Sequence, residues 1–324
     1  MTETKETSID PKDWTLLALL SVLWGGAFFF TGVAVRELPP LTIVLARVGL
    51  AALLLLPVHW IMLGGLPIGF SAWRAFIIMA ALNNVIPFSL IVAGQREIAS
   101  GLASVLNATT PLFTVLIMAS FGEEKLIFRK VLGVLLGLGG VAILRGQTPF
   151  TLGDAHTWGV ALCLGGAVSY GFAGLWGRRH LSGVPPLTSA TCQVLCSTLI
   201  TSVLASALER PWMLAAPSVP TLWSLVGFAG LSTALAYIVF FQILVRSGAS
   251  NVMLVTLLIP VTSLLLGHLI LGEVIEPREI AGALVIASSL LVLDGRVLAF
   301  FGKRNRTRFD GPHAIRVTDK QRDR

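Results

Sequence analysis

Polar side chains interrupt several of the long apolar stretches in this 324-residue chain. They include Asn83, Asn84, Asn107, Ser232 and Thr233, with Thr109, Thr110 and Thr256 at similar positions in their stretches. Their amide and hydroxyl groups donate and accept hydrogen bonds, so the chemistry that they offer is reversible recognition of a polar solute. An unpaired polar group is costly in lipid, and we therefore expect these side chains to face a bundle interior or a cavity. The alternative is that they only hold helices together.

Aromatic residues and one arginine lie in the same stretches. Aromatic rings can stack on a substrate or fill the core, and the guanidinium of Arg47 can extend to the membrane surface, pair with a carbonyl, or bind a carboxylate. The predicted substrate-binding residues are Trp24, Asn83, Asn84, Phe88, Asn107, Tyr170, Thr233 and Tyr237, with Arg47 as the partner for a carboxylate. Pro111 and Pro260 are predicted hinges, because proline removes a backbone donor and bends a helix.

The sequence lacks the motifs of an enzyme or of an ATP-driven pump. It has no GxxxxGK[ST] loop, and no cluster of His, Asp or Cys suited to a metal or a nucleophile. No Asp or Glu lies in the middle of an apolar stretch, which argues against a buried proton-coupling carboxylate. We therefore expect no cofactor and no catalysis. A channel is a weaker alternative, because no ring of charges or filter-like loop is visible.

The composition indicates that lipid is the solvent. Apolar residues make up 55% of the chain and charged residues 13%, with a mean hydropathy of +0.82, whereas about 25% charged residues is usual in soluble domains. Much of the net charge of +7 lies in a basic tail after the last apolar stretch, where it suits cytoplasm and anionic lipid. Nucleic-acid binding is not expected. Cys163, Cys192 and Cys196 lie within apolar stretches and are expected to pack as free thiols.

Stretches of about 20 apolar residues can cross a bilayer as helices. We predict ten, near residues 14–35, 41–62, 73–95, 98–121, 131–145, 157–177, 187–208, 221–245, 249–271 and 280–300. If the N-terminus lies inside, 18 Lys and Arg residues fall in inner segments, nine before the tail and nine within it. Only five fall in outer loops. This excess of positive charge places both termini in the cytoplasm.

An internal duplication relates the two halves of the chain. The sequence PPLT at 39–42 recurs at 185–188, an offset of 146 at which Arg47 meets Gln193. At an offset of 149 the matched pairs are Phe88 with Tyr237, Pro111 with Pro260, and Glu124 with Glu273. Each copy holds five predicted spans, an odd number, so the second copy enters the membrane from the opposite side. The predicted fold is therefore an all-α membrane protein of ten transmembrane helices in two inverted five-helix repeats.

The expected domain order follows from these spans. It is a cytoplasmic segment at 1–13, a first repeat at 14–145, a linker at 146–156, a second repeat at 157–300 and a basic cytoplasmic tail at 301–324. Glu124 and Glu273 follow predicted helix ends and suit ion pairs or loop caps. Gly133 and Gly137 form a GxxxG motif, which permits close helix contact within the bundle or in a homodimer.

Several of these features together resemble the EamA-type branch of the drug/metabolite transporter superfamily. They are the duplicated five-span unit, the aromatic-Gly pair in the first span of each half, the proline-containing fourth span followed by Glu, and the stretch from Pro40 to Arg47. The resemblance covers roughly residues 14–300. It implies a central cavity formed mainly by helices 1, 3, 4, 6, 8 and 9, and export of metabolites such as amino acids across the bacterial inner membrane. Uptake of a vitamin-like or other organic compound stays open, because the aromatic residues also suit it.

Overall fold

The computed structural model describes residues 11–67, 69–146, 154–247, 252 and 254–294. Within these ranges every regular element is a helix, which suits a membrane because a helix satisfies its own backbone hydrogen bonds where water is absent. Seven helical segments among the described residues are long and apolar enough to cross a bilayer, and one further apolar helix, α13, is shorter. The predicted all-α membrane fold is thus confirmed for this part of the chain.

The helices of the first half follow the predicted spans closely. They are α1 (Pro11–Ala34), α2 (Pro40–Leu63), α3 (Phe70–Ala80), α4 (Ile86–Gly94), α5 (Ser100–Asn107), α6 (Thr110–Ser120) and α7 (Phe128–Arg145). Pro40 and Pro111 lie in the first turn of α2 and α6, where a missing N–H leaves no hydrogen bond unmade. Two helices begin three residues earlier than predicted: the first span starts at Pro11 instead of residue 14, and the fifth starts at Phe128 instead of residue 131.

The second half repeats this order. Its helices are α8 (Ala155–His180), α9 (Pro186–Leu208), α10 (Val219–Ala229), α11 (Ala236–Ser247), α13 (Val255–Leu271) and α14 (Pro277–Asp294), with a single 3-10 turn at Pro211–Met213. The Asp154 side chain caps α8 by accepting a 3.1 Å hydrogen bond from the Thr157 N–H. Several predicted segments lie outside the described residues. They are the first ten residues, most of the linker, the basic tail, residues 295–300 of the tenth predicted span, and residues 249–251 and 253 of the ninth.

Three of the predicted continuous spans are interrupted. A π-helical turn, η1 (Ala81–Val85), joins α3 to α4, and another, η3 (Gly230–Leu235), joins α10 to α11. The two turns begin 149 residues apart, which is the offset of the sequence duplication. The fourth span divides into α5 and α6 at Ala108–Thr109. Apolar periodicity could not predict these interruptions, because a π turn or a short kink leaves the surrounding residues equally apolar.

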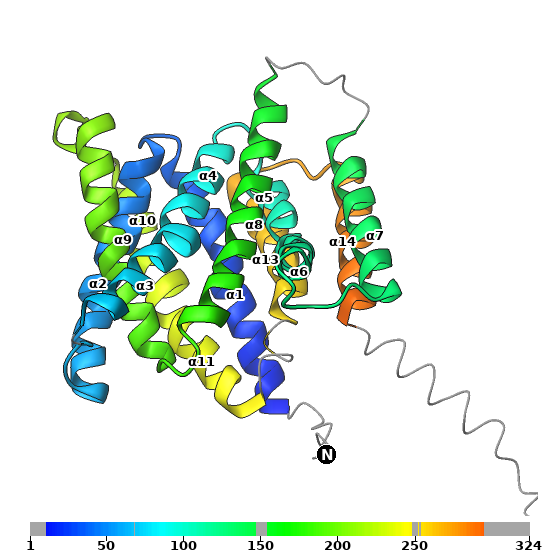
Figure 1. Ribbon diagram of the computed structural model, residues 1–324. Coiled ribbons are helices and arrows are strands. Elements are labelled where there is room, and N and C mark those ends of the chain that lie inside the picture. The colour runs from blue at the N-terminus through cyan, green and yellow to red at the C-terminus, as the bar shows by residue number, and fades with distance from the viewer. Residues whose placement is uncertain (1–10, 68, 147–153, 248–251, 253, 295–324) are drawn as a thin grey trace, which may run out of the picture.

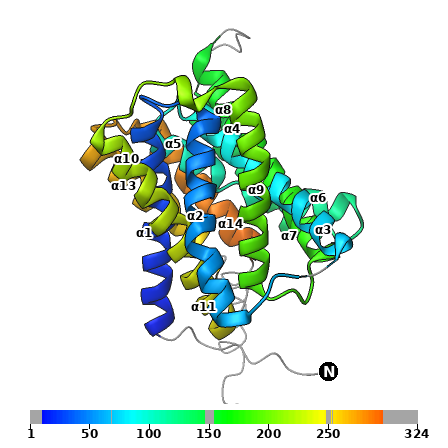
Figure 2. The same cartoon turned by 90° about the vertical axis from the view of Figure 1, so that its left-hand side faces the viewer.

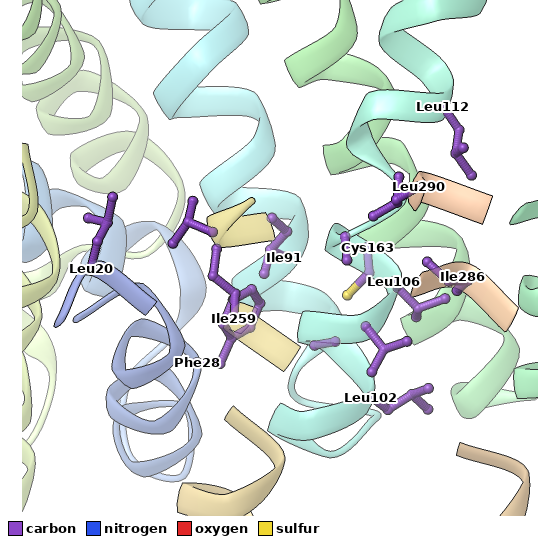
Figure 3. Close-up of a cluster of buried hydrophobic side chains, with 14 of the residues drawn as sticks. Leu20, Phe28, Ile91, Leu102, Leu106, Leu112, Cys163, Ile259, Ile286 and Leu290 are labelled. Carbon is purple, nitrogen blue, oxygen red and sulfur yellow. The ribbon is translucent and has the colours of Figure 1, made fainter. Parts of the chain in front are cut away.

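Helices of the two halves pack against one another throughout the bundle. Helix α1 packs on α13, α2 on α9, α4 and α6 on α8, and α7 on α14. Figure 1 shows the α7–α14 pair at one flank and α2 with α9 at the other, and Figure 2 looks onto the flank with α2 and α9. Side chains from α1, α4, α5, α6, α7, α8, α11, α13 and α14 contribute to the largest buried cluster, in which Leu106, Cys163 and Ile286 are fully buried (Figure 3).

The GxxxG motif contributes to the contact between α7 and α14. A Cβ atom on Gly133 would lie 3.2 Å from the Ser289 carbonyl oxygen, and one on Gly140 would lie 3.1 Å from the Gly282 carbonyl oxygen. A Cβ atom on Gly137 would overlap Leu112 Cδ1 and would lie 3.1 Å from the Ser289 hydroxyl oxygen. The motif is therefore occupied within the bundle, and a homodimer would have to use another surface.

Both described ends of the chain lie on one side of the bundle. Helix α1 begins and α14 ends toward the lower side of Figure 1, which we call the lower end; the end where α1 finishes and α2 begins is the upper end.

Candidate functional site

A cavity of about 820 Å³ lies between the two halves of the bundle. Nine of the eleven residues predicted for the substrate site and hinges line it, namely Trp24, Arg47, Asn83, Phe88, Asn107, Pro111, Tyr170, Thr233 and Tyr237. They come from α1, α2, η1, α4, α5, α6, α8, η3 and α11, so elements far apart in the chain converge on one space. The size is that of a small-molecule site, which usually encloses about 300–1,000 Å³.

Two predicted residues lie elsewhere. Asn84 is fully buried away from the cavity, and its amide donates a 2.9 Å hydrogen bond to the Ser197 hydroxyl on α9. Pro260 is buried inside α13, which continues through it without a break. Asn83, next to Asn84 on the η1 turn, faces the cavity and donates a 3.0 Å hydrogen bond to the Gln193 side-chain oxygen.

The guanidinium of Arg47 is held by two aromatic rings and a hydroxyl. Its central carbon lies 3.6 Å from the centroid of the Phe88 ring and 4.3 Å from that of Phe228. Its Nε donates a 3.1 Å hydrogen bond to the Thr233 hydroxyl, which in turn donates to the Phe228 carbonyl at 3.0 Å. The rings stabilise the cation through their negative faces, and they restrict its position.

Three polar atoms around the cavity are buried without a hydrogen-bond partner among the described residues. They are the side-chain oxygens of Gln95, Asn107 and Ser232, all of which belong to cavity-lining residues. A buried polar atom without a partner costs free energy, so native proteins usually pair it with water or a ligand. The cavity wall therefore has hydrogen-bonding capacity that a polar solute could use.

Sequence reasoning missed two glutamines of the site. Gln95, which appeared to belong to the connection after the third span, is buried and donates a 2.9 Å hydrogen bond to the Phe28 carbonyl. Gln193 donates to the Ser189 hydroxyl at 2.8 Å and accepts from Asn83. The duplication pointed to Gln193, because it matches Arg47 at the offset of 146. No comparable signal marked Gln95.

The upper end of the bundle carries a second pocket next to the cavity. Gln95 forms part of the cavity wall and also of a separate upper pocket of about 490 Å³. Beside it, the Glu273 carboxylate caps the start of α5, accepting hydrogen bonds from the Ser100 N–H at 3.0 Å and from the Ser100 hydroxyl at 2.8 Å. The loop-cap interpretation of Glu273 is thus confirmed. A carboxylate at a helix N-terminus also interacts favourably with the helix dipole.

Two further carboxylates bind helix starts at the upper end. Glu37 accepts hydrogen bonds from the N–H and hydroxyl of Ser218, which precedes α10, and the hydroxyl contact holds the pKa of Glu37 below its ordinary value. Glu209 accepts from the N–H groups of Leu41 and Thr42 in the first turn of α2. Each of these contacts joins one half of the chain to the other.

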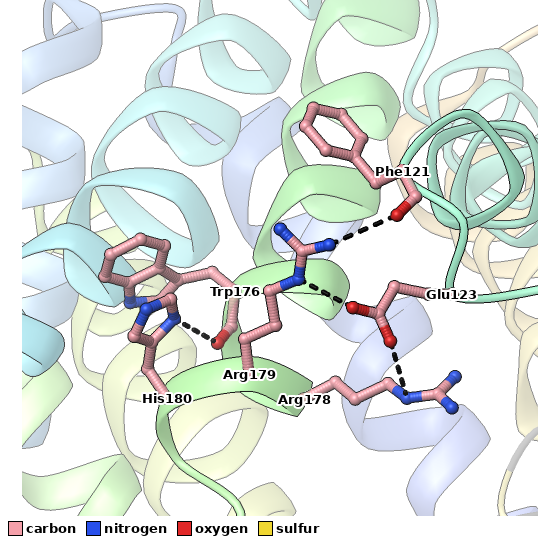
Figure 4. Close-up of polar contacts among 6 residues, drawn as sticks. All are labelled: Phe121, Glu123, Trp176, Arg178, Arg179 and His180. Atoms are coloured by element: carbon pink, nitrogen blue, oxygen red, sulfur yellow. Dashed lines mark hydrogen bonds and ion pairs between the residues drawn. The ribbon is translucent and has the colours of Figure 1, made fainter.

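The lower end carries ion pairs, and the cavity reaches it. Glu124 pairs with Lys130, as the ion-pair interpretation predicts. Glu123 accepts a 2.7 Å hydrogen bond from Arg179 near the end of α8, and Arg178 lies 3.6 Å away (Figure 4). The cavity lining extends to Leu181, Val184 and Pro186 in and beside the α8–α9 connection, and to Asp294 at the end of α14.

Known proteins resemble this chain along most of its length. It is 25% identical over 283 residues to the uncharacterized transporter YoaV of Bacillus subtilis, covering 86% of this chain and 95% of that protein. It is 26% identical over 292 residues to the uncharacterized inner membrane transporter YedA of Escherichia coli K12, covering 87% of this chain and 90% of YedA. A protein of known crystal structure shares the fold with a TM-score of 0.62 at 16% identity, over 88% of this chain and 98% of its own.

The sequence model of one family matches the chain twice, once in each half. The matches cover residues 13–146 and 157–293, the helical regions whose junction encloses the cavity. The chain therefore belongs to the EamA-like transporter family.

Proposed function

We propose that the protein is a secondary or facilitative transporter that exports small metabolites, such as amino acids or related polar solutes, by alternating access. The observation that carries this proposal is the cavity of about 820 Å³ at the junction of the two halves. Its wall combines aromatic rings, side-chain amides with unmet hydrogen-bonding capacity, and one guanidinium. Such a wall suits a solute with both polar and apolar parts.

The proposal includes ten membrane crossings in two inverted repeats. The 18-residue helices α7 and α14 would each extend about 27 Å, close to the thickness of the hydrocarbon core. Equivalent helices of the two halves make equivalent contacts. Helix α1 packs on α13, and its counterpart α8 packs on α5 and α6; likewise α3 packs on α9, and its counterpart α10 packs on α2. A twofold axis in the membrane plane would produce this exchange, and it gives alternating access a structural origin.

The two ends of the bundle suit an inward-open state. The cavity lining extends to the lower end, and we propose that Gln95 and the Glu273 cap close the upper end. Among the described residues, Lys and Arg in the connections and at the helix ends favour the lower end, with eight there against five at the upper end. We therefore propose that the lower end and both termini are cytoplasmic, in the bacterial inner membrane. In this orientation a cytoplasmic solute could enter the cavity directly, which is the first step of export.

Growth of an overexpressing bacterial strain against toxic concentrations of amino acids and other metabolites tests this function. We expect resistance to at least one compound, with a lower cellular content of that compound. The hit is then measured with the purified protein in liposomes, beside protein-free liposomes and a known transporter. A panel that produces no protein-dependent flux, while the known transporter works, would contradict the proposal. Increased cellular content would indicate import.

A further inference from the structure

The only cation that lines the central part of the cavity, within the described residues, is Arg47. We infer that the cavity selects small organic monoanions with an apolar body, and that Arg47 binds their carboxylate. The inference rests on the proposed transport function and defines the substrate class of the same site.

The position of Arg47 makes its charge costly. It is the eighth residue of α2, about 10 Å from the start of that helix, and therefore within the apolar depth of the bundle. A cation at membrane depth is rare, and it is usually paired with an anion. Among the described residues the ion pairs join other cations, and none contains Arg47.

The other charge in the cavity wall cannot serve as a counterion for Arg47. Asp294 is the last residue of α14 and lies at the lower mouth of the cavity. The aromatic contacts and the Thr233 hydroxyl lower the cost of the cation without neutralising it. An anionic ligand would supply the missing negative charge.

The way in which Arg47 is held prepares it for a carboxylate. The Arg47 Nε donates its hydrogen bond to the Thr233 hydroxyl, while the Phe88 and Phe228 rings lie against the guanidinium carbon. The two terminal nitrogens therefore provide the edge that remains for a ligand. A guanidinium edge matches the two oxygens of a carboxylate, and charge-assisted hydrogen bonds of this kind are about twice as strong as neutral ones.

The duplication shows that the charge occurs on one side of the cavity only. Gln193, the residue that matches Arg47 in the second half, is neutral and forms hydrogen bonds with Asn83 and Ser189. Rings of Trp24 and Phe240, whose centroids are 5.5 Å apart, provide an apolar wall. This arrangement suits a solute with one carboxylate and an apolar body. A dianion such as a phosphate monoester would bring more negative charge than one guanidinium can compensate.

Binding of chemically matched probes to the purified full-length protein tests this inference. The probes are benzoate, its neutral amide benzamide, the cation benzylamine, and phenyl phosphate, each measured by calorimetry. We expect the wild-type protein to bind benzoate about tenfold or more tightly than benzamide, and this preference to disappear in Arg47→Gln. Arg47→Lys, which keeps the charge but loses the fork geometry, should retain part of it. Arg74→Gln, which removes an exposed arginine of α3 outside the cavity lining, should bind as the wild type does.

Each outcome has a defined meaning. Equal affinity for benzoate and benzamide, no binding of benzoate, a preference for benzylamine or phenyl phosphate, or a benzoate preference that survives in Arg47→Gln would overturn the inference. If Arg47→Gln does not fold, Arg47→Lys and Thr233→Val decide it, because both should weaken benzoate binding more than benzamide binding. Liposome flux is measured separately: carboxylate-selective binding without flux would contradict the transport function alone, and flux of neutral solutes only would contradict the inference alone.

Discussion

Asn83 and Asn84 are neighbours in the sequence, but the η1 turn gives them different surroundings. The Asn83 amide lines the cavity and contacts Gln193, whereas the Asn84 amide is fully buried against Ser197. The Asn83 amide also donates a 3.4 Å hydrogen bond to the Asn84 side-chain oxygen, so substitutions at the two positions separate binding from packing only when flux and stability are both measured.

We predict that Asn83→Leu lowers transport about tenfold or more while the amount of protein in the membrane stays near that of the wild type. Asn84→Leu should instead destabilise the protein by about 1–3 kcal/mol, because it removes a buried hydrogen bond to Ser197. Flux per molecule in liposomes and thermal unfolding in detergent measure the two effects. If Asn83→Leu loses abundance and flux in equal proportion, Asn83 is a packing residue.

At the scale of the elements, close approach of α7 and α14 depends on glycine at particular positions. A Cβ atom on Gly140 would lie 2.7 Å from Ile286 Cγ1 and 3.1 Å from the Gly282 carbonyl oxygen, whereas nothing lies within 4 Å of a Cβ on Gly139. The two helices are thus held by backbone contact that a larger side chain on the Gly140 face would prevent.

We predict that Gly140→Leu destabilises the protein by about 1–3 kcal/mol and lowers its abundance. Gly139→Leu should be tolerated, because its side chain would point away from the bundle. Fluorescence-detected size-exclusion chromatography and thermal unfolding compare the pair. Equal tolerance of both substitutions would show that α7 and α14 do not need this close contact.

Acid should weaken the contact between the α6–α7 connection and the end of α8. The Arg179 hydrogen bond lowers the pKa of Glu123 below its ordinary value of 4.5. A carboxyl with a lowered folded-state pKa stabilises the protein above its unfolded-state pKa, and this contribution is lost as the pH falls through the folded-state value. The melting temperature of the wild type should therefore fall more steeply than that of Glu123→Gln below about pH 4.5.

Glu97→Gln, which changes an exposed carboxyl at the upper end, is the matched control and should keep the steep wild-type profile. Identical acid profiles for the wild type and Glu123→Gln would show that the Arg179–Glu123 contact does not stabilise the protein.

At the scale of the whole molecule, the two ends of the bundle differ in the contacts that join the halves. Carboxylates on helix starts join them at the upper end, through Glu37, Glu209 and Glu273. At the lower end, the Asp13–Arg246 pair joins the beginning of α1 to the end of α11, with a further contact from Ser247. Alternating access would require these two sets of contacts to form and break in turn.

We predict that Glu273→Ala opens the upper end more often. Thr31 lines the cavity in the last turn of α1, near the upper end, and is 2% exposed. A cysteine at this position should therefore react slowly with an impermeant maleimide added at the upper end, which the proposed orientation places outside. Labelling of Thr31→Cys should increase severalfold when Glu273→Ala is added, since the cap on Ser100 is lost. The parent without the introduced cysteine is the control, because its three native thiols are buried. Unchanged labelling would show that the cap does not limit opening.

The amino-acid sequence by itself determined the helical membrane fold, the approximate positions of the helices and the family resemblance. Apolar length, proline positions and a repeated pattern are local properties that can be read along the chain. The same patterns pointed to nine of the residues that line the cavity, including Trp24, Asn107 and Tyr237, because polar and aromatic groups inside apolar helices are uncommon enough to attract attention.

Only the tertiary structure decided which face each of these residues presents and what it contacts. The Asn84 amide contacts Ser197 on α9, the Gln95 amide contacts the Phe28 carbonyl, and α14 packs against the GxxxG face of α7. The surroundings of Arg47 also came from α4, α10 and η3, up to 186 residues away. The physical reason is that a side chain's partner is set by helix rotation, by the extra residue of a π turn and by long-range packing, none of which changes the local apolar pattern.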